Sequence, residues 1–388
     1  MMKRTLANLF LLTCMVSLMA GCSSNRKKDL EPVELESFRE TVEIDKLWSK
    51  TIGSGPGKYY HQFQLAVDAQ YLYAASEDGK VYQLDKLKGK KRWKVSLDTE
   101  LTSGVAVDDA RVYVGAMDGS VIALSKDSGE QVWVQLLSSE VVSPPAVYGQ
   151  HLLVHLSNGE IYDLNTVDGS VRWRVGSNVP ALTIRGTSQV IAFSDIALTG
   201  LANGKLGLFD LNTGQLRGEP RVAVAQGDSE IERIVDVDAT PLFIDGKIYA
   251  VSYQGKILAL DLQSGHVLWT ADESSYHQAA SGFGNIYVAS ANGSVVAYDQ
   301  KSGDIQWVQD GLLRRKLTAP AVVSSYVAVA DFEGYLHLLS QINGEFAARV
   351  RVNSSGVKAP ILVDGENFYS IANNGKLKAY RLGETQGE

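Results

Sequence analysis

The stretch MDGSVIALSKDSGEQVW, residues 117–133, carries the pattern that decides the fold. An alternating run, ARVYVGAM at residues 110–117, precedes Gly119, and a second apolar run follows it. Asp-Gly or Asn-Gly between such runs is a strong signal of a β-hairpin, and it favours a type I′ turn, in which both central residues need positive φ. Gly129 then closes another hairpin, before a strand that contains Trp133. The stretch therefore predicts consecutive antiparallel strands.

The same arrangement of two glycines and a tryptophan recurs along the whole chain. Gly218 replaces the tryptophan in the fourth copy, Ala348 replaces it in the seventh, and the eighth copy ends after its first glycine. Four-stranded units at this spacing are typical of β-propeller blades. The sequence therefore predicts an all-β, eight-bladed β-propeller of four-stranded antiparallel blades, in which the tryptophans pack between blades rather than bind a ligand. The first glycines of the eight copies, spaced 38 to 51 residues apart, are Gly79, Gly119, Gly159, Gly204, Gly255, Gly293, Gly334 and Gly375.

The two ends of the repeat region complement each other. The eighth copy lacks a fourth strand, whereas Trp48 in the segment IDKLWSKT lies 45 residues before Trp93 with no glycine hairpin ahead of it. We expect this N-terminal strand to supply the outer strand of the last blade and to close the ring. A single propeller domain is predicted over residues 44–382, followed by a tail at 383–388.

The first residues have the pattern of a signal peptide. Lys3 and Arg4 precede an apolar run that is short for a membrane span, and small residues then lead to Cys22. This ending is similar to a lipoprotein box, although Met19 stands where leucine is usual. Residues 1–21 are predicted to be removed and Cys22 to be acylated, for example with palmitate. The alternative is ordinary cleavage without a lipid. After removal of Cys14, the remaining cysteine could form no internal disulfide.

Residues 22–43 are polar, charged and poor in aromatic side chains, so we expect the lipidated cysteine to be followed by a flexible tether. Ser23 resembles the signal that sorts lipoproteins to the outer membrane. The cluster Arg26-Lys27-Lys28 is expected to be solvated or to face lipid headgroups. The net charge of the chain is −7, and no basic stripe is apparent, which argues against binding to nucleic acid.

The sequence lacks the usual patterns of catalytic and metal sites. A phosphate loop at residues 52–59 would need glycine at Ile52 and serine or threonine at Tyr59. His151 and His155 would lie about 13 Å apart on one strand, too far to share a metal ion. The pair Asp236 and Asp238 lacks the glycine and distal glutamate of a calcium loop. We therefore expect no catalytic residue, cofactor or metal.

The repeat resembles the Trp-docked blades of quinoprotein dehydrogenases, which use pyrroloquinoline quinone (PQQ), and this resemblance supplies the enzyme alternative. Those enzymes place their cofactor on a disulfide between adjacent cysteines and hold calcium nearby. The mature chain would have no second cysteine and no room for the large insertions that build such a pocket. The resemblance therefore implies a shared scaffold rather than a shared site.

Two connectors between blades are longer than the others, and elaborated loops on a rigid scaffold often bind partners. One contains PALTIRG at residues 180–186, and the other runs over residues 220–240. Apolar side chains and an arginine suit a protein interface, and the aspartates could pair with that arginine or with a basic partner. The alternative is that the apolar pair points into the core and the aspartates cap turns. The candidate partner-binding residues are Leu182, Ile184, Arg185, Asp236 and Asp238.

Together with the lipoprotein box and the eight blades, the segments GSGPG at residues 53–57, PALTIRG and EIERIVDVDATP at 230–241 resemble the BamB family of the outer-membrane β-barrel assembly machinery. The resemblance covers essentially the whole mature chain. It implies a lipid anchor in the outer membrane, facing the periplasm, and binding to the POTRA domains of BamA through the five candidate residues. Ile184 stands where the family has leucine, which keeps the apolar character. A scaffold that assists unfolded barrel precursors is implied, without an enzymatic activity.

Overall fold

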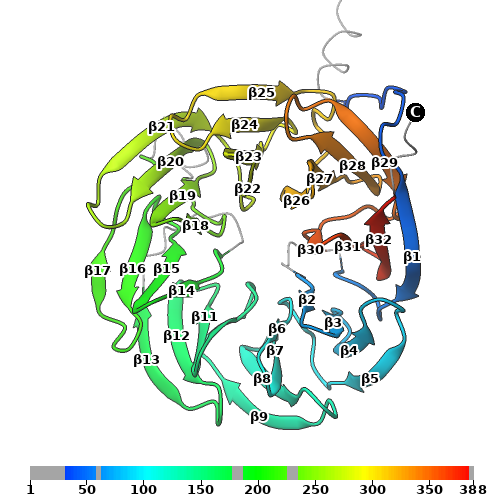
Figure 1. Cartoon of the computed structure of the whole chain (residues 1–388). Coiled ribbons are helices and arrows are strands. Elements are labelled where there is room, and N and C mark those ends of the chain that lie inside the picture. The colour runs from blue at the N-terminus through cyan, green and yellow to red at the C-terminus, as the bar shows by residue number, and fades with distance from the viewer. Residues whose placement is uncertain (1–30, 58–62, 177–186, 225–234, 384–388) are drawn as a thin grey trace, which may run out of the picture.

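The computed structural model describes residues 31–57, 63–176, 187–224 and 235–383. These residues form eight antiparallel sheets, each of four strands, and Figure 1 shows the sheets arranged as blades around a central axis. The predicted eight-bladed β-propeller is confirmed.

Each blade runs from a short inner strand to an outer strand. Blade 1 contains β2 (Ala66–Val67), β3 (Tyr71–Ala75), β4 (Lys80–Asp85) and β5 (Lys91–Ser96), and blade 2 contains β6 (Ala106–Val107), β7 (Arg111–Gly115), β8 (Ser120–Ser125) and β9 (Gln131–Leu136). Blade 3 contains β10 (Ala146–Tyr148), β11 (His151–His155), β12 (Glu160–Asn165) and β13 (Val171–Gly176), and blade 4 contains β14 (Ile191–Phe193), β15 (Ile196–Gly200), β16 (Leu206–Asp210) and β17 (Leu216–Gly218). Blade 5 contains β18 (Leu242–Ile244), β19 (Lys247–Val251), β20 (Gly255–Asp261) and β21 (Val267–Glu273), and blade 6 contains β22 (Ala280–Gly282), β23 (Asn285–Ala289), β24 (Val295–Asp299) and β25 (Ile305–Gln309). Blade 7 contains β26 (Ala321–Val323), β27 (Tyr326–Ala330), β28 (Tyr335–Ser340) and β29 (Phe346–Arg351), and blade 8 contains β30 (Leu362–Asp364), β31 (Asn367–Ile371), β32 (Lys376–Leu382) and β1 (Ile44–Thr51).

The hairpin at each first glycine is present, but its turn differs from the predicted type I′. At Asp78-Gly79, only the glycine has a positive φ, of 78°. This pattern fits a longer loop that ends in a left-handed glycine. Turns with two positive φ values lie instead between the two inner strands of some blades, as at Asp245 (49°) and Gly246 (76°). The sequence motif therefore indicated the hairpin correctly and its turn type wrongly.

The tryptophans pack between blades, as the repeat predicted. The Nε1–H of Trp93 in blade 1 donates to the O atom of Lys126 in blade 2, at 2.9 Å. A Cβ atom on Gly129 would lie 2.8 Å from the Trp93 ring, so the second glycine of blade 2 leaves the space that the ring fills. The other five tryptophans make the same bond and contact at their own junctions. A fully buried aromatic side chain of this size contributes several kcal/mol, so these contacts join the blades.

The inter-blade connectors lie beside the hairpins at the first glycines, on one face of the ring that we call the connector face. Backbone bonds from Met117 to Glu100 and from Phe332 to Arg315 join the two kinds of loop. The second hairpins, which include Gly89 and Gly129, lie at the other ends of the strands. The long connectors predicted to bind partners therefore belong to the connector face.

The ring is closed by its two chain ends. Strand β1 pairs with β32 from Ile44 opposite Leu382 to Thr51 opposite Lys376, so blade 8 contains the first and the last strands of the protein (Figure 1). Trp48 on β1 contacts Gly89 of blade 1 and is buried. The predicted closure by the N-terminal strand is confirmed.

Residues 31–43 differ from the flexible tether that their composition predicted. This segment, which we call the strap, runs along blade 7 beside β29 (Figure 1). The N atom of Thr41 donates to the O atom of Ala347 at 2.8 Å, and the rings of Phe38 and Phe346 stack with centroids 5.3 Å apart. Val42 is buried in the core between blades 7 and 8. The strap is therefore part of the folded body.

A buried group of charged residues in blade 7 holds the strap. The Nε–H of Arg315 donates to Asp331 at 2.7 Å, and its Nη1 group donates to the O atom of Val33 at 2.9 Å. Arg349 donates from Nη1 to the O atom of Glu36 at 2.9 Å. The Nε2–H of His337 also donates to Asp331, at 3.2 Å. Burial alone would raise the pKa of Asp331, but its bonds with His337 and Arg315 hold that pKa below the ordinary value.

Candidate functional site

The structure describes two of the five predicted site residues. Leu182, Ile184 and Arg185 lie outside the described residues. Asp236 and Asp238 are described and stand just before β18, on the segment that enters blade 5 from the long connector. Their side chains are buried, with exposed fractions of only 1% and 6%. The sequence placed them on a loop surface, whereas the structure places them inside.

The burial of the aspartates follows from how their segment threads between blades 4 and 5. The N atom of Val237 donates to the O atom of Leu201 in blade 4, and the N atom of Tyr253 in blade 5 donates to the O atom of Asp236. A Cβ atom on Gly200 would lie only 2.0 Å from the O atom of Val237, so this close approach requires glycine at the end of β15. Both faces of the segment are therefore covered by protein.

The described ends of the two long connectors contact each other. Ser188, which follows the first connector, donates from its hydroxyl to the O atom of Ala239, which ends the second, at 3.3 Å. The N atom of Gln189 donates to Oγ1 of Thr240 at 3.2 Å. Segments more than fifty residues apart in the sequence thus lie side by side at the entrances to blades 4 and 5. The structure brings the described ends of the two predicted loops to one place on the connector face.

His155 supports this junction and was not singled out as part of the site by the sequence. Its Nδ1–H donates to the O atom of Ser188 at 2.9 Å, and the Thr199 hydroxyl donates to the same O atom at 3.2 Å. Burial lowers the pKa of His155 to about 4, so the imidazole is neutral at pH 7. The histidine is a structural donor, and its burial, which the sequence does not reveal, sets it apart from the partly exposed His151.

The electrostatics of the aspartate pair are unusual. Burial raises the pKa of Asp238 to about 8, and the neighbouring carboxylate of Asp236 acts in the same direction. Asp238 is therefore mostly protonated at pH 7. A protonated carboxyl group can donate a hydrogen bond, which an ionised carboxylate cannot.

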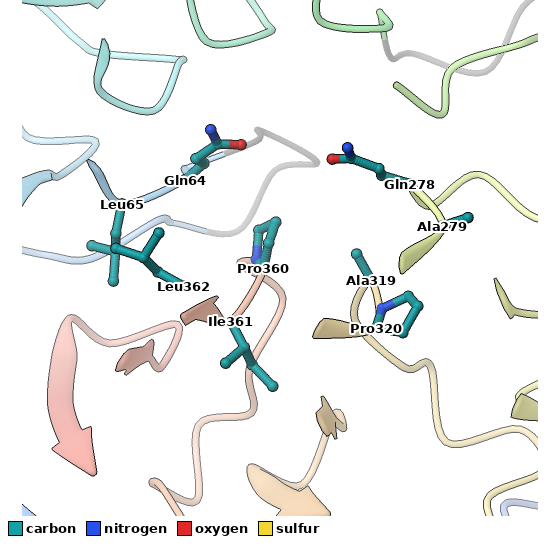
Figure 2. A pocket seen from close by; sticks show the side chains of 9 residues that line it. All are labelled: Gln64, Leu65, Gln278, Ala279, Ala319, Pro320, Pro360, Ile361 and Leu362. Atoms are coloured by element: carbon teal, nitrogen blue, oxygen red, sulfur yellow. The ribbon is translucent and has the colours of Figure 1, made fainter. Parts of the chain in front are cut away.

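A cavity of about 260 Å³ lies near the central axis, away from the aspartate pair. It is lined by residues at the entrances to the inner strands of blades 1, 6, 7 and 8, and Figure 2 shows Gln64 and Gln278 on two sides of it. The remaining lining is mostly apolar and includes Pro320 and Pro360. Within the described ranges, no group of three or more metal-ligating side chains is found, and no helix there is long and apolar enough to cross a bilayer.

These features define a class of protein: a closed eight-bladed propeller of Trp-docked, PQQ-like repeats, with two enlarged connectors whose described ends meet at blades 4 and 5. The family model described as "Outer membrane protein assembly factor BamB" matches residues 77–309 and 292–386. The chain belongs to this family, and is thus an outer-membrane protein assembly factor.

Relatives and solved structures agree with this assignment. The chain is 47% identical to the BamB of Pseudomonas aeruginosa, over 93% of this chain and 95% of that protein. It is 41% identical to the BamB of Aliivibrio fischeri, over 98% and 100%. The crystal structure of BamB from Moraxella catarrhalis superimposes with a TM-score of 0.82 at 26% identity, and covers 87% of this chain and 100% of that one. A quinohemoprotein alcohol dehydrogenase from Comamonas testosteroni, at 13% identity and a TM-score of 0.70, shares the fold alone.

Proposed function

We propose that this chain is a non-enzymatic scaffold subunit of the outer-membrane β-barrel assembly complex, which binds the POTRA domains of BamA through the two long connectors. Through BamA it would assist the folding and insertion of barrel precursors. The observation that carries the proposal is the contact between the connector ends at Ser188–Ala239 and Gln189–Thr240. Because these ends lie together, Leu182, Ile184 and Arg185 of the first connector would act next to the aspartates of the second.

The burial of the aspartates suggests that they have a different role from the other residues of this site. A carboxylate with an exposed fraction of 1% or 6% offers little surface to a partner. We infer that Asp236 and Asp238 fix the connectors through their buried position between blades 4 and 5, and that Leu182, Ile184 and Arg185 make the contact with BamA. A guanidinium held by a carboxylate is well oriented for a protein interface because its donors are fixed in a plane.

The anchor is part of the same proposal. Residues 1–21 would be removed as a signal peptide, and Cys22 would be acylated and inserted into the periplasmic leaflet of the outer membrane. The described chain begins nine residues later, at Glu31. The strap, which begins at Glu31, is held on blade 7, so it would fix where the anchored end joins the ring.

Copurification with BamA from detergent-solubilised envelopes tests the contact. Arg185→Ala and Leu182→Ala should reduce recovery of BamA strongly while the propeller stays folded. Asp236→Asn/Asp238→Asn, which keeps the size of both side chains, should reduce it less. Arg172→Ala, on the outer strand of blade 3, changes an exposed arginine elsewhere and should leave recovery unchanged. Full recovery of BamA with a folded Arg185→Ala/Leu182→Ala variant would refute the site.

The enzyme alternative has its own measurement. Addition of PQQ and calcium to the purified chain should give neither a bound quinone absorption band nor dye reduction with alcohols. Turnover under these conditions would contradict a purely structural role.

A further inference from the structure

The outer edge of blade 1 carries a dense group of positive charges on a protein whose net charge is −7. The hairpin between β4 and β5 and the strand β5 itself read KLKGKKRWK, residues 86–94. Five of the cationic side chains in this stretch are exposed, and Lys50 of the neighbouring strand β1 reaches the O atom of Gly89 at 3.5 Å. We call this group the basic rim; it consists of Lys50, Lys88, Lys90, Lys91, Arg92 and Lys94.

The basic rim is not neutralised by the protein. Among the described residues, none of its six cations makes an ion pair, although seven other lysine and arginine side chains do. Asp85, the acid closest in sequence, accepts the backbone N–H groups of Leu87 and Lys88 and is thereby used in the turn. Arg92 and Lys94 lie over the rings of Tyr71 and Tyr82 instead. The rim therefore presents its charge to an outside anion.

An apolar side chain stands at the tip of the same hairpin. Leu87 is 52% exposed, and it is flanked by lysines on both sides. Lysines around a protruding leucine suit a lipid surface, where the ammonium groups meet phosphates and the leucine enters the boundary with the acyl chains. An acidic protein partner would gain less from an exposed leucine. A surface that binds such a partner would also contain arginines rather than lysines, because arginine binds carboxylates in a bidentate way.

The start of the described chain lies on the same side of the ring as the rim, with Glu31 on the connector face and Leu87 at the opposite ends of the strands. The strap leaves blade 7 at Glu31, whose O atom accepts the Nε–H of Arg314, and strand β1 completes blade 8 next to the rim. Figure 1 shows β1 and β5 on one side of the ring, and blades 4 and 5 on the opposite side. A tether from Glu31 to a membrane on the side of blades 7, 8 and 1 would leave the partner site free.

We propose that the basic rim binds the surface of a membrane that contains anionic phospholipids, and so turns the side of the ring with blades 4 and 5 away from the lipid. The inference uses the proposed lipid anchor only to bring the ring close to the membrane. Binding by the rim itself needs no acyl chain, so the two can be tested apart.

Flotation with vesicles tests the rim on a chain that starts at Ser23 and therefore carries no lipid. This chain should bind vesicles made of phosphatidylglycerol and phosphatidylcholine in equal parts, and should not bind phosphatidylcholine alone. Each lysine close to an anionic surface contributes about fivefold in partitioning, so Lys88→Gln/Lys90→Gln/Lys91→Gln should weaken binding on the order of 100-fold at low salt. Leu87→Ser should weaken it by a smaller factor that persists at high salt.

A second triple variant provides the matched control. Lys256→Gln/Lys301→Gln/Lys316→Gln removes the same charge from exposed lysines of blades 5 and 6 and the connector to blade 7, and should bind the vesicles like the unchanged chain. Equal binding to both kinds of vesicle, or equal losses in the two triple variants, would overturn the proposal. An acidic envelope protein that the rim retains in the absence of vesicle binding would also overturn it, in favour of a protein partner. Because detergent-solubilised BamA recovery requires no membrane, it reports on the proposed function independently.

Discussion

Two junctions of the ring lack the docking tryptophan, and the protein treats them differently. Between blades 7 and 8, Ala348 stands in its place and is 1% exposed, because Val42 of the strap and Tyr380 of β32 pack around it. Between blades 4 and 5, Gly218 stands in its place, and a Cβ atom added to it, or to Gly265 of the receiving hairpin, would meet no atom within 4 Å. The first junction is filled at its outer edge, and the second is open there.

The difference follows from whether the next blade has a second hairpin on which a tryptophan ring could pack. Blade 8 has no second hairpin, because its outer strand β1 comes from the other end of the chain, so a tryptophan on blade 7 would have no glycine to pack on. Blade 5 has that hairpin, and its junction is instead joined close to the axis, where Phe193 and Phe243 stack at 3.8 Å. The open junction separates the two blades that the long connectors enter, and its unfilled edge lies at the second hairpin, away from the connector face. Departures from the repeat thus mark ring closure in one place and the candidate site in the other.

The same contrast appears in two buried aspartates. Asp331 of blade 7 has a lowered pKa, because its bonds with His337 and Arg315 outweigh its burial, whereas burial and Asp236 raise the pKa of Asp238. At the first, bonds to Asp331 favour its charged form; at the second, burial of Asp238 favours its protonated form. The two should therefore respond in opposite ways to mutation and to pH.

Removal of the compensating arginine should cause the largest loss of stability at a fixed pH. Arg315→Ala leaves Asp331 buried without its guanidinium partner and removes the bond to the O atom of Val33 in the strap, and should destabilise the protein by about 3–5 kcal/mol in chemical denaturation. Arg217→Ala, which breaks an exposed pair with Asp195 in blade 4, is the control and should change little. If the two variants lost similar stability, the network of blade 7 would not have the role assigned to it.

The pH dependence of stability separates the junctions next. The folded pKa of Asp238 is about 8 and its ordinary value is 3.8, so the folded state binds a proton that the unfolded state releases between these values. Stability should therefore fall as pH rises from about 4 to 8, by up to about 1.4 kcal/mol per pH unit. Asp238→Asn should remove this slope, and denaturation midpoints across the pH range measure it. Asp331→Asn should instead lose stability that the wild type has above pH 3.8, and an unchanged slope in Asp238→Asn would contradict the assignment.

The strap gives a smaller effect. Phe38→Ala loses the ring stacked on Phe346 and the face that Arg349 covers at 4.8 Å, and should cost about 1–2 kcal/mol. It should also increase proteolysis within residues 31–43. Ile342→Ala, at a side chain of blade 7 that is 80% exposed, should do neither. A strap as resistant to protease as before would mean that Phe38 does not hold it.

The open junction can be closed by design, with the smallest expected effect. Gly218 has no positive φ and has space around it, so Gly218→Trp should place an indole over Gly265, as the other tryptophans pack on their glycines, and stabilise the protein by about 1 kcal/mol. Gly218→Ala tests the backbone contribution alone. Thermal unfolding measures both, and no gain from tryptophan beyond that of alanine would show that blade 5 cannot receive it.

Most of the fold could be predicted from the sequence, because hairpin glycines and docking tryptophans act locally and recur. The strap could not be predicted: residues 31–43 look polar, and the groups that hold their backbone, Arg315 and Arg349, lie about 300 residues away. The burial of Asp236 and Asp238 was missed for a similar reason. Nothing in a short acidic motif reveals that the connector threads between two blades and passes Gly200 closely.

The pairing of β1 with β32 also has a consequence for biogenesis. The hydroxyl of Ser49 bonds to the O atom of Leu377, 328 positions further along the polypeptide. The first strand to emerge during secretion must therefore wait, unpaired, until the last one has been delivered, and contacts of such long sequence separation form slowly. Throughout that interval, an exposed β-strand edge is open to chaperones and proteases, and premature termination of synthesis before β32 would leave a chain unable to complete its circle.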